Sequence, residues 1–113
     1  MVFNTSRMSP SFFWNVWAMR FTSAGAGKTV SVNGGLNGPL GVAIAPNCNI
    51  LTVNSNDGEI TETAPGGQQV NWIFLDSSGS PKGAGTLFGL AVAPGGKGVY
   101  FVDDGENQLN LFH

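Results

Sequence analysis

One apolar pattern occurs twice along the chain and predicts most of its elements. The run LGVAIAP at residues 40–46 returns as FGLAVAP at residues 88–94, so its closing proline recurs after 48 positions. Each proline is followed by a short polar turn and a second apolar run. A cluster of Asn, Asp and Gly then leads to a third run. Short apolar runs separated by such turns predict strands joined by hairpins.

The two copies predict two units of short strands. In the first unit the expected strands are Gly41–Ala45, Ile50–Asn54, Glu59–Thr63 and Gln68–Leu75. In the second they are Leu87–Ala93, Val99–Asp103 and Gln108–Phe112, with no run for a fourth strand. A strand-built unit that recurs every 40–50 residues is typical of a β-propeller blade. We therefore predict an all-β protein of antiparallel, four-stranded meander blades, a partial β-propeller with about two blades per chain.

The N-terminal region differs from these units in composition. Residues 1–22 hold six of the chain's twelve aromatic residues and both arginines. Residues 12–17 would place apolar side chains on both faces of a strand, so we expect a strand that is covered on both sides. A short amphipathic helix after Ser9-Pro10 is the alternative. A further short strand is expected at Thr29–Val32, where polar and β-branched residues alternate.

A glycine-rich segment before that strand resembles part of a phosphate-binding loop. The sequence GAGKT occupies residues 25–29, but Thr22 stands where such a loop has its first glycine. β-branched residues follow, where the loop requires a helix. The segment is therefore predicted to be a hairpin turn.

Composition excludes some partners. Charged residues make up 11% of the chain, with 17 Gly and 6 Pro, which favours closely spaced turns over solvated helices. The net charge of −2 offers no basic surface, so no nucleic-acid partner is expected. No apolar run approaches the roughly 18 residues of a membrane span, so no membrane partner is expected either.

The cellular compartment stays open. Cys48 is the sole cysteine, so the chain has no internal disulfide that would indicate an oxidising environment. The N-terminus loosely resembles a signal peptide, although Asn15 and Arg20 interrupt its apolar part. An extracellular or periplasmic location is compatible with these features, and so is a cytoplasmic one.

Residues 36–55 and 86–104 resemble NHL repeats, the blade units of a family of β-propellers. The first match reads LNGPLGVAIAP and then NILTVNS, and the second reads TLFGLAVAP and then GVYFVDD. Cys48 departs from the pattern, because NHL repeats have a glycine at that turn. The family includes protein-binding scaffolds, RNA-binding modules, amidating lyases and lactonase-like relatives, so the resemblance implies a fold and leaves the activity open.

The domain organisation follows from the repeats. Residues 1–35 form an aromatic-rich segment and a strand that is expected to complete a neighbouring blade. Residues 36–85 form the first blade, and residues 86–113 a second blade without its outer strand. Because propellers of this kind have about six blades, two blades leave apolar faces in water. We expect a homo-oligomer, with three copies closing a ring favoured over an open dimer or another assembly.

The candidate ligand-binding face lies where the second and fourth strands of a blade end. Propeller ligands usually bind there, over the central axis. The candidate residues on this face are Asn54, Asn56, Asp57, Asp103, Asp104, Glu106 and Asn107. Asn37, Ser55 and residues 76–82 are expected on the same face. Asp103, Asp104 and Glu106 are also candidate calcium ligands, because hard cations prefer carboxylate oxygens. A solvated hairpin turn is the alternative for these three residues.

No catalytic residue is predicted. His113, the sole histidine, lies beyond the last strand, so a hydrolase triad is not expected, and the ligands of a zinc site are lacking. The expected function is a non-catalytic module that binds a protein or small ligand on this face and needs no cofactor. A metal-assisted lyase or lactonase-like enzyme is the alternative. A truncated propeller remnant without specific function is a further one.

Overall fold

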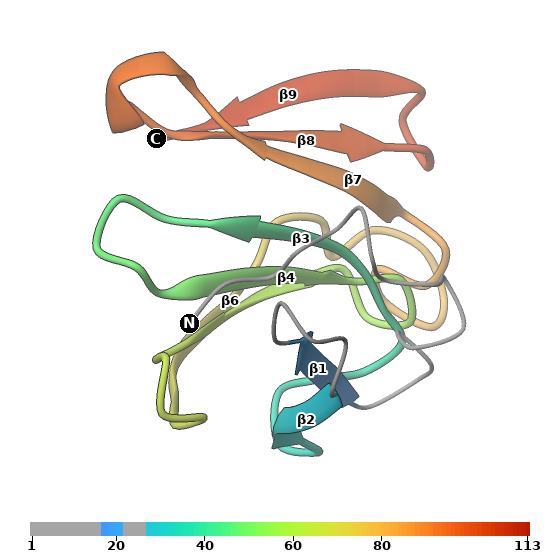
Figure 1. The fold of residues 1–113 in the computed structure, drawn as a ribbon. Helices are drawn as coiled ribbons and strands as arrows, with labels where there is room; N and C mark the ends of the chain where they lie inside the picture. Colours follow the sequence, from blue (N-terminus) through green and yellow to red (C-terminus); the bar gives the residue numbers. More distant parts are fainter. Residues whose placement is uncertain (1–16, 22–26) are drawn as a thin grey trace.

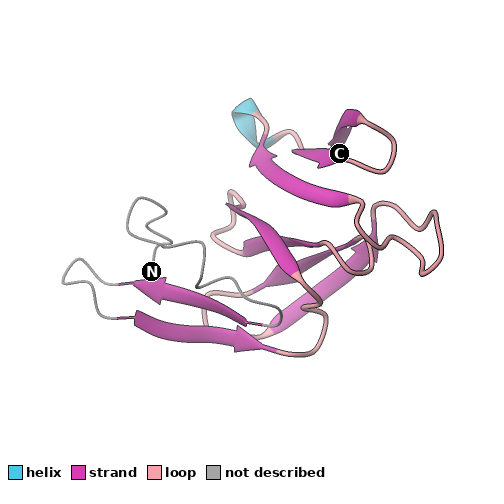
Figure 2. Ribbon diagram, turned by 90° about the vertical axis from the view of Figure 1, so that its right-hand side faces the viewer, coloured by secondary structure: helices cyan, strands magenta, loops and turns pink. Residues whose placement is uncertain are grey.

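The structure, a computed structural model, describes residues 17–21 and 27–113 as three antiparallel sheets (Figures 1 and 2). β1 and β2 form a hairpin, β3 to β6 a four-stranded sheet, and β7 to β9 a three-stranded sheet, with chain neighbours adjacent throughout. The strands are β1 (Trp17–Phe21), β2 (Gly27–Val32), β3 (Pro39–Ile44), β4 (Ile50–Asn54), β5 (Glu59–Thr63), β6 (Gln69–Phe74), β7 (Leu87–Val92), β8 (Val99–Asp103) and β9 (Gln108–Phe112). A short 3-10 turn, η2 (Pro94–Gly96), joins β7 to β8.

The predicted strands of both units are confirmed. β4, β5, β8 and β9 have the predicted bounds, and β3, β6 and β7 differ from theirs by one or two residues at an end. Residues 27–29 of the glycine-rich segment belong to β2, so this part is a strand and neither a helix nor a turn, and residues 25 and 26 lie outside the described residues. The strand predicted over residues 12–17 lies outside the described residues except for Trp17. Within the described ranges, no helix has the length and hydropathy to cross a bilayer.

Local chemistry explains the tight turn between β4 and β5. Asp57 Oδ1 accepts a hydrogen bond from the Glu59 backbone N–H at 3.0 Å, which closes the turn from within. Gly58 follows with φ 71°, a left-handed conformation that glycine adopts without steric cost. A side chain at this position would also collide with the Asp76 carbonyl, so the turn packs directly against the β6–β7 connection.

The hydrophobic core lies between the two larger sheets. Val53 and Ile60 of the four-stranded sheet pack against Leu87 and Phe101 of the three-stranded sheet, and all four side chains are buried. Their first strands, β3 and β7, lie side by side at the centre (Figure 1). Gly41 allows this approach, because a Cβ there would lie 2.5 Å from the Phe88 carbonyl oxygen. Successive meander sheets packed in this way are two neighbouring blades of a partial β-propeller.

The β1–β2 hairpin lies on the opposite side of the four-stranded sheet from β7–β9 (Figures 1 and 2). Gln69 of β6 fixes it there: its Nε2 donates to the Asn33 carbonyl oxygen at 2.8 Å and to Ser31 Oγ at 3.1 Å. Its Oε1 accepts from the Gly35 N–H at 2.6 Å. In chain order β2 precedes β3 as β6 precedes β7. That residues 1–35 complete a neighbouring blade stays a prediction.

Candidate functional site

The β4–β5, β6–β7 and β8–β9 connections lie together at one end of the two blades. The β6–β7 connection contacts both neighbouring turns: the Gly85 N–H donates to the Ser55 carbonyl oxygen at 2.5 Å, and the Asp104 N–H to the Thr86 carbonyl oxygen at 2.7 Å. The segment before β3 joins them, since the Ser55 N–H donates to the Gly38 carbonyl oxygen at 2.8 Å. Residues 33–38, 55–58, 75–86 and 103–107 are called the loop face below.

Two predicted site residues of the first blade lie on the surface of the loop face. Asn37 Nδ2 donates to Asp57 Oδ2 at 2.9 Å, and Asn56 Nδ2 donates to Asn37 Oδ1 at 3.2 Å. Asn56 is exposed and Asp57 is half-buried. Asn37, which the sequence also places on this face, holds both residues in position.

Asn54 lies below this surface. Its side chain is fully buried, so a ligand on the loop face does not meet it. Asn54 Nδ2 donates to the Gly35 carbonyl oxygen at 2.6 Å, and Thr61 Oγ1 donates to the same oxygen at 2.9 Å. Because Asn54 ends β4 with its side chain toward the hairpin, it holds the segment before β3 against the sheet.

The acidic turn of the second blade divides into one buried and three exposed residues. Asp103 is 4% exposed, and its Oδ1 accepts from the Glu106 backbone N–H at 3.1 Å. Asp104, Glu106 and Asn107 are exposed. In the described parts of the chain, no group of three or more His, Cys, Asp and Glu side chains could hold a metal ion. The calcium site at Asp103, Asp104 and Glu106 therefore stays a prediction.

Asp76 adds a carboxylate from the segment 76–82, which the sequence places on the same face. Its Oδ1 accepts from the Ser78 backbone N–H at 2.7 Å, and its Oδ2 is buried without a hydrogen-bond partner. The Ser78 backbone bond lowers the pKa of Asp76, and the Ser78 hydroxyl and the nearby Asp103 side chain lower it further. The Asp76-Ser77-Ser78 sequence, one residue beyond the end of β6, is a signal for such a turn.

A second pair of carboxylates lies at the start of β5. Burial raises the pKa of Glu59, and the charge of the neighbouring Asp57 raises it further. Like charges disfavour one another's ionisation, so Glu59 takes up a proton more readily than an isolated carboxylate does as the pH falls.

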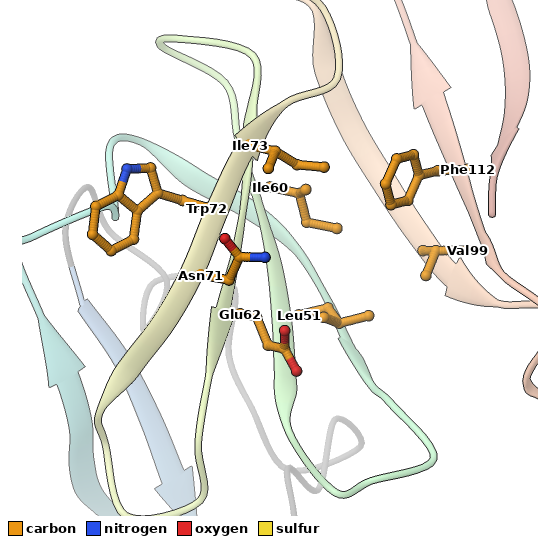
Figure 3. A pocket seen from close by; sticks show the side chains of 8 residues that line it. All are labelled: Leu51, Ile60, Glu62, Asn71, Trp72, Ile73, Val99 and Phe112. Atoms are coloured by element: carbon orange, nitrogen blue, oxygen red, sulfur yellow. The ribbon is translucent and has the colours of Figure 1, made fainter.

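Two of the hollows near the blades differ in character. A depression of about 230 Å³ adjoins the loop face and is lined by Val102, Asp103, Asp104, Asn107, Gln108 and Leu109. A cleft of about 100 Å³ separates the sheets and is lined by Leu51, Ile60, Glu62, Asn71, Trp72, Ile73, Val99 and Phe112 (Figure 3).

The cleft between the sheets is largely apolar. Figure 3 shows Ile60 and Ile73 of one sheet facing Phe112 of the other, while the Trp72 ring points to the far side of its sheet. Because the three-stranded sheet has no described fourth strand to face β6, the gap is the outer part of the blade–blade contact. The depression beside the acidic turn is the better candidate for a ligand.

Comparisons with known proteins support the architecture. No protein-family model and no curated protein matches the chain. Among solved structures it is similar to a catalytically inactive His-to-Ala variant of virginiamycin B lyase from Staphylococcus aureus, crystallised with quinupristin. The TM-score is 0.57 at 14% sequence identity, and the match covers 91% of this chain. It covers 35% of the lyase, so the chain spans about a third of that protein's length.

At this identity the similarity shows the fold alone. The predicted fold class is confirmed: the chain is all-β, with antiparallel meander sheets arranged as in a β-propeller. The assignment of its repeats to the NHL type rests on the sequence resemblance.

Proposed function

We propose that the chain is a non-catalytic, NHL-like β-propeller module whose loop face binds a ligand carrying cationic groups. The ligand is either a protein segment with Lys and Arg side chains or a small amine. Both present the same chemistry, a compact positive charge with hydrogen-bond donors. The NHL assignment is supported by the two repeats, whose matched residues fall on β3, β4, β7 and β8.

The distribution of charge carries this proposal. Five of the chain's seven carboxylates belong to the loop face, namely Asp57, Asp76, Asp103, Asp104 and Glu106. Among the described side chains, Lys82 is the only cation in the same loops. Carboxylates gathered at one end of a molecule attract a cationic ligand and speed its association.

The geometry adds hydrogen-bonding groups to the charge. Exposed Asp104 and Asn107 line the 230 Å³ depression, and exposed Val102 and Leu109 give it an apolar wall. A few polar groups at the edge of an apolar hollow are typical of small-ligand sites. The aliphatic stem of a lysine or arginine fits the wall while its charged end meets the carboxylates.

No structural observation favours the lyase or lactonase alternative. The structural neighbour is a lyase, and the inactive variant of it replaces a histidine. The sole histidine of this chain, His113, follows β9 beside Gly98, at the end of the strands opposite the loop face. The alternative therefore rests on Asp103, Asp104 and Glu106 alone. Calcium titration followed by calorimetry tests this alternative. If calcium produces no heat of binding and no thermal shift, the alternative is excluded.

A peptide-binding experiment tests the cationic-ligand proposal. Fluorescence anisotropy of labelled Lys- and Arg-containing peptides is expected to show binding that weakens with salt. The double variant Asp104→Asn/Glu106→Gln is expected to weaken it about fivefold or more. Glu62→Gln is the matched control, because Glu62 lies in β5 outside the loop face. Its Oε1 accepts a hydrogen bond from Asn49 Nδ2 at 2.6 Å. Equal affinity for acidic peptides, or equal loss in the control, would refute the proposal.

A further inference from the structure

Two exposed apolar side chains occupy the same position on the first strands of the two blades. Leu40 of β3 is 46% exposed and Phe88 of β7 is 42% exposed, whereas the residues directly before them, Pro39 and Leu87, are fully buried. Both are the second residue of a strand that follows a segment of the loop face, so both lie at the loop-face end of their blade. The two strands run side by side (Figure 1).

Each of the two side chains belongs to a β-bulge. In β3 the cross-strand pairing skips Leu40, and in β7 it skips Phe88 and Gly89. Each bulged segment therefore has one residue more than the strand opposite. A bulge bends its strand and changes the direction of a side chain, and bulges are frequent beside binding sites. The repeat thus places an apolar side chain in a bulge at the loop-face end of both blades.

The exposure of Leu40 does not depend on a missing neighbour. The second blade already packs against the first beside it, since an added Cβ at Gly41 would lie 2.5 Å from the Phe88 carbonyl oxygen. Val53, on the strand paired with β3, is fully buried by the same contact between blades. Leu40 nevertheless stays 46% exposed, so a neighbouring blade does not cover this position of the repeat.

Phe88 lies beside the depression of the loop face. The residue after it, Gly89, approaches Val102 so closely that an added Cβ would lie 3.2 Å from Val102 Cγ2. Val102 belongs to the apolar wall of the depression. Asp104 is also near, because its backbone N–H donates to the carbonyl oxygen of Thr86, two residues before Phe88, at 2.7 Å. An apolar side chain therefore adjoins the wall and the acidic turn of the proposed cation site.

We propose that Leu40 and Phe88 form an apolar subsite of the loop face, and that the ligand is a protein segment in which a large apolar side chain lies next to a Lys or Arg. This inference rests on the proposed function, because it assigns a second contact to the same cationic ligand.

The positions of the two contacts favour a protein segment over a small amine. Leu40 lies on the first blade and the depression on the second, so a ligand that meets both must extend across the blades. An extended peptide advances about 3.3 Å per residue and presents successive side chains to such separate contacts. Covering the half-exposed side chains removes apolar area from water, which stabilises the complex. The carboxylates of the loop face supply the charge complementarity.

Two labelled peptides of equal net charge test the subsite by fluorescence anisotropy with the full chain. One peptide has Leu or Phe beside each Lys, and the other has Ser at the same positions. The apolar peptide is expected to bind about tenfold more tightly. Added salt should weaken the binding of both peptides and leave the ratio of their affinities unchanged, because screening acts on charges.

Variants locate the apolar contact. Leu40→Ala and Phe88→Ala should each reduce the ratio of affinities to about threefold or less, because they remove apolar area from the subsite. Leu40→Met keeps an apolar side chain of similar size and should retain the ratio. Leu111→Ala is the matched control, because Leu111 is 44% exposed near the end of β9 that lies away from the loop face. Circular dichroism checks folding, and Leu40→Gln replaces Leu40→Ala if that variant does not fold.

The outcomes separate this inference from the proposed function. If both peptides bind with equal affinity, the subsite is refuted and the cationic-ligand proposal stands. If neither peptide binds, both are refuted. A preference for the apolar peptide that Leu40→Ala and Phe88→Ala leave unchanged would also overturn the inference, because the apolar contact would then lie elsewhere.

Discussion

Val53 and Val102 occupy the same position in the two blades, yet Val53 is fully buried and Val102 is 40% exposed. Both valines lie on the second strand, one residue before its end, and both pair with an apolar residue of the third strand. The difference arises because Val53 faces the next blade and Val102 faces solvent. Exposure in a propeller depends on the neighbouring blade as well as on the residue.

Truncating the two valines is expected to have unequal effects. Val53→Ala leaves a cavity in the core and should lower the free energy of unfolding by about 2 to 3 kcal/mol. Val102→Ala should cost less than about 1 kcal/mol at concentrations where the chain is monomeric. Urea unfolding at low concentration measures both. Equal costs would contradict the assignment of the core to the space between β4 and β7–β8.

A second prediction concerns Gly41, where the two blades approach closely. Gly41→Ala places a Cβ 2.5 Å from the Phe88 carbonyl oxygen and 2.8 Å from Val53 Cγ2. Since β3 and β7 must separate to admit it, we expect a loss of about 1 to 3 kcal/mol in thermal or urea unfolding. Gly66→Ala is the control, because no atom lies within 4 Å of its added Cβ. A control loss as large as that of Gly41→Ala would count against this explanation.

Gln69 is expected to hold the hairpin against the four-stranded sheet. Gln69→Ala removes its three hydrogen bonds to residues 31–35 at a cost of about 2 kcal/mol. The loss should be local, so hydrogen exchange should speed up in β2 and in residues 33–35 while β4 and β5 stay protected. The neighbouring Gln68→Ala serves as control, because the Gln68 side chain is exposed. Uniform acceleration across both sheets would argue that the hairpin and the sheets unfold as one unit.

The lowered pKa of Asp76 predicts an acid-dependent loss of stability. Its folded pKa lies below the usual value of 3.8, so the native state favours the ionised carboxylate. The resulting stabilisation is fully present above 3.8 and is lost as pH falls through the folded pKa. Asp76→Asn should therefore flatten the decline in stability between about pH 4 and about pH 2, measured by urea unfolding. An unchanged decline would show that other carboxylates account for it.

The fold was predictable because its signals are local. Alternating apolar runs, the Asp57-Gly58 turn and the two proline-ended repeats specify strands without knowledge of their neighbours. The ends of β3 and β6 shifted by one or two residues, because cross-strand pairing and the bulges at Pro39–Gly41 and Glu62–Thr63 decide where a strand begins.

The candidate site was predictable only in part. The sequence placed Asn56, Asp57, Asp104, Glu106 and Asn107 in turns, where hydrophilic residues are normally exposed. It could not distinguish Asn54 and Asp103, which end β4 and β8 with their side chains buried. It placed residues 76–82 on the same face, but it could not show that Asp76 meets Asp103, because the two residues are 27 positions apart in the chain.

The sequence by itself determined the all-β class, the repeat and the position of each predicted turn, because these depend on periodicity and on backbone preferences of neighbouring residues. Only the tertiary structure decided which face of each sheet is covered, which carboxylates meet, and where the β1–β2 hairpin lies. Those features depend on contacts between strands far apart in the chain. The local sequence around Val53 and Val102 is similar, so it does not show which of the two side chains is buried. Only the packing of the blades decides their exposure.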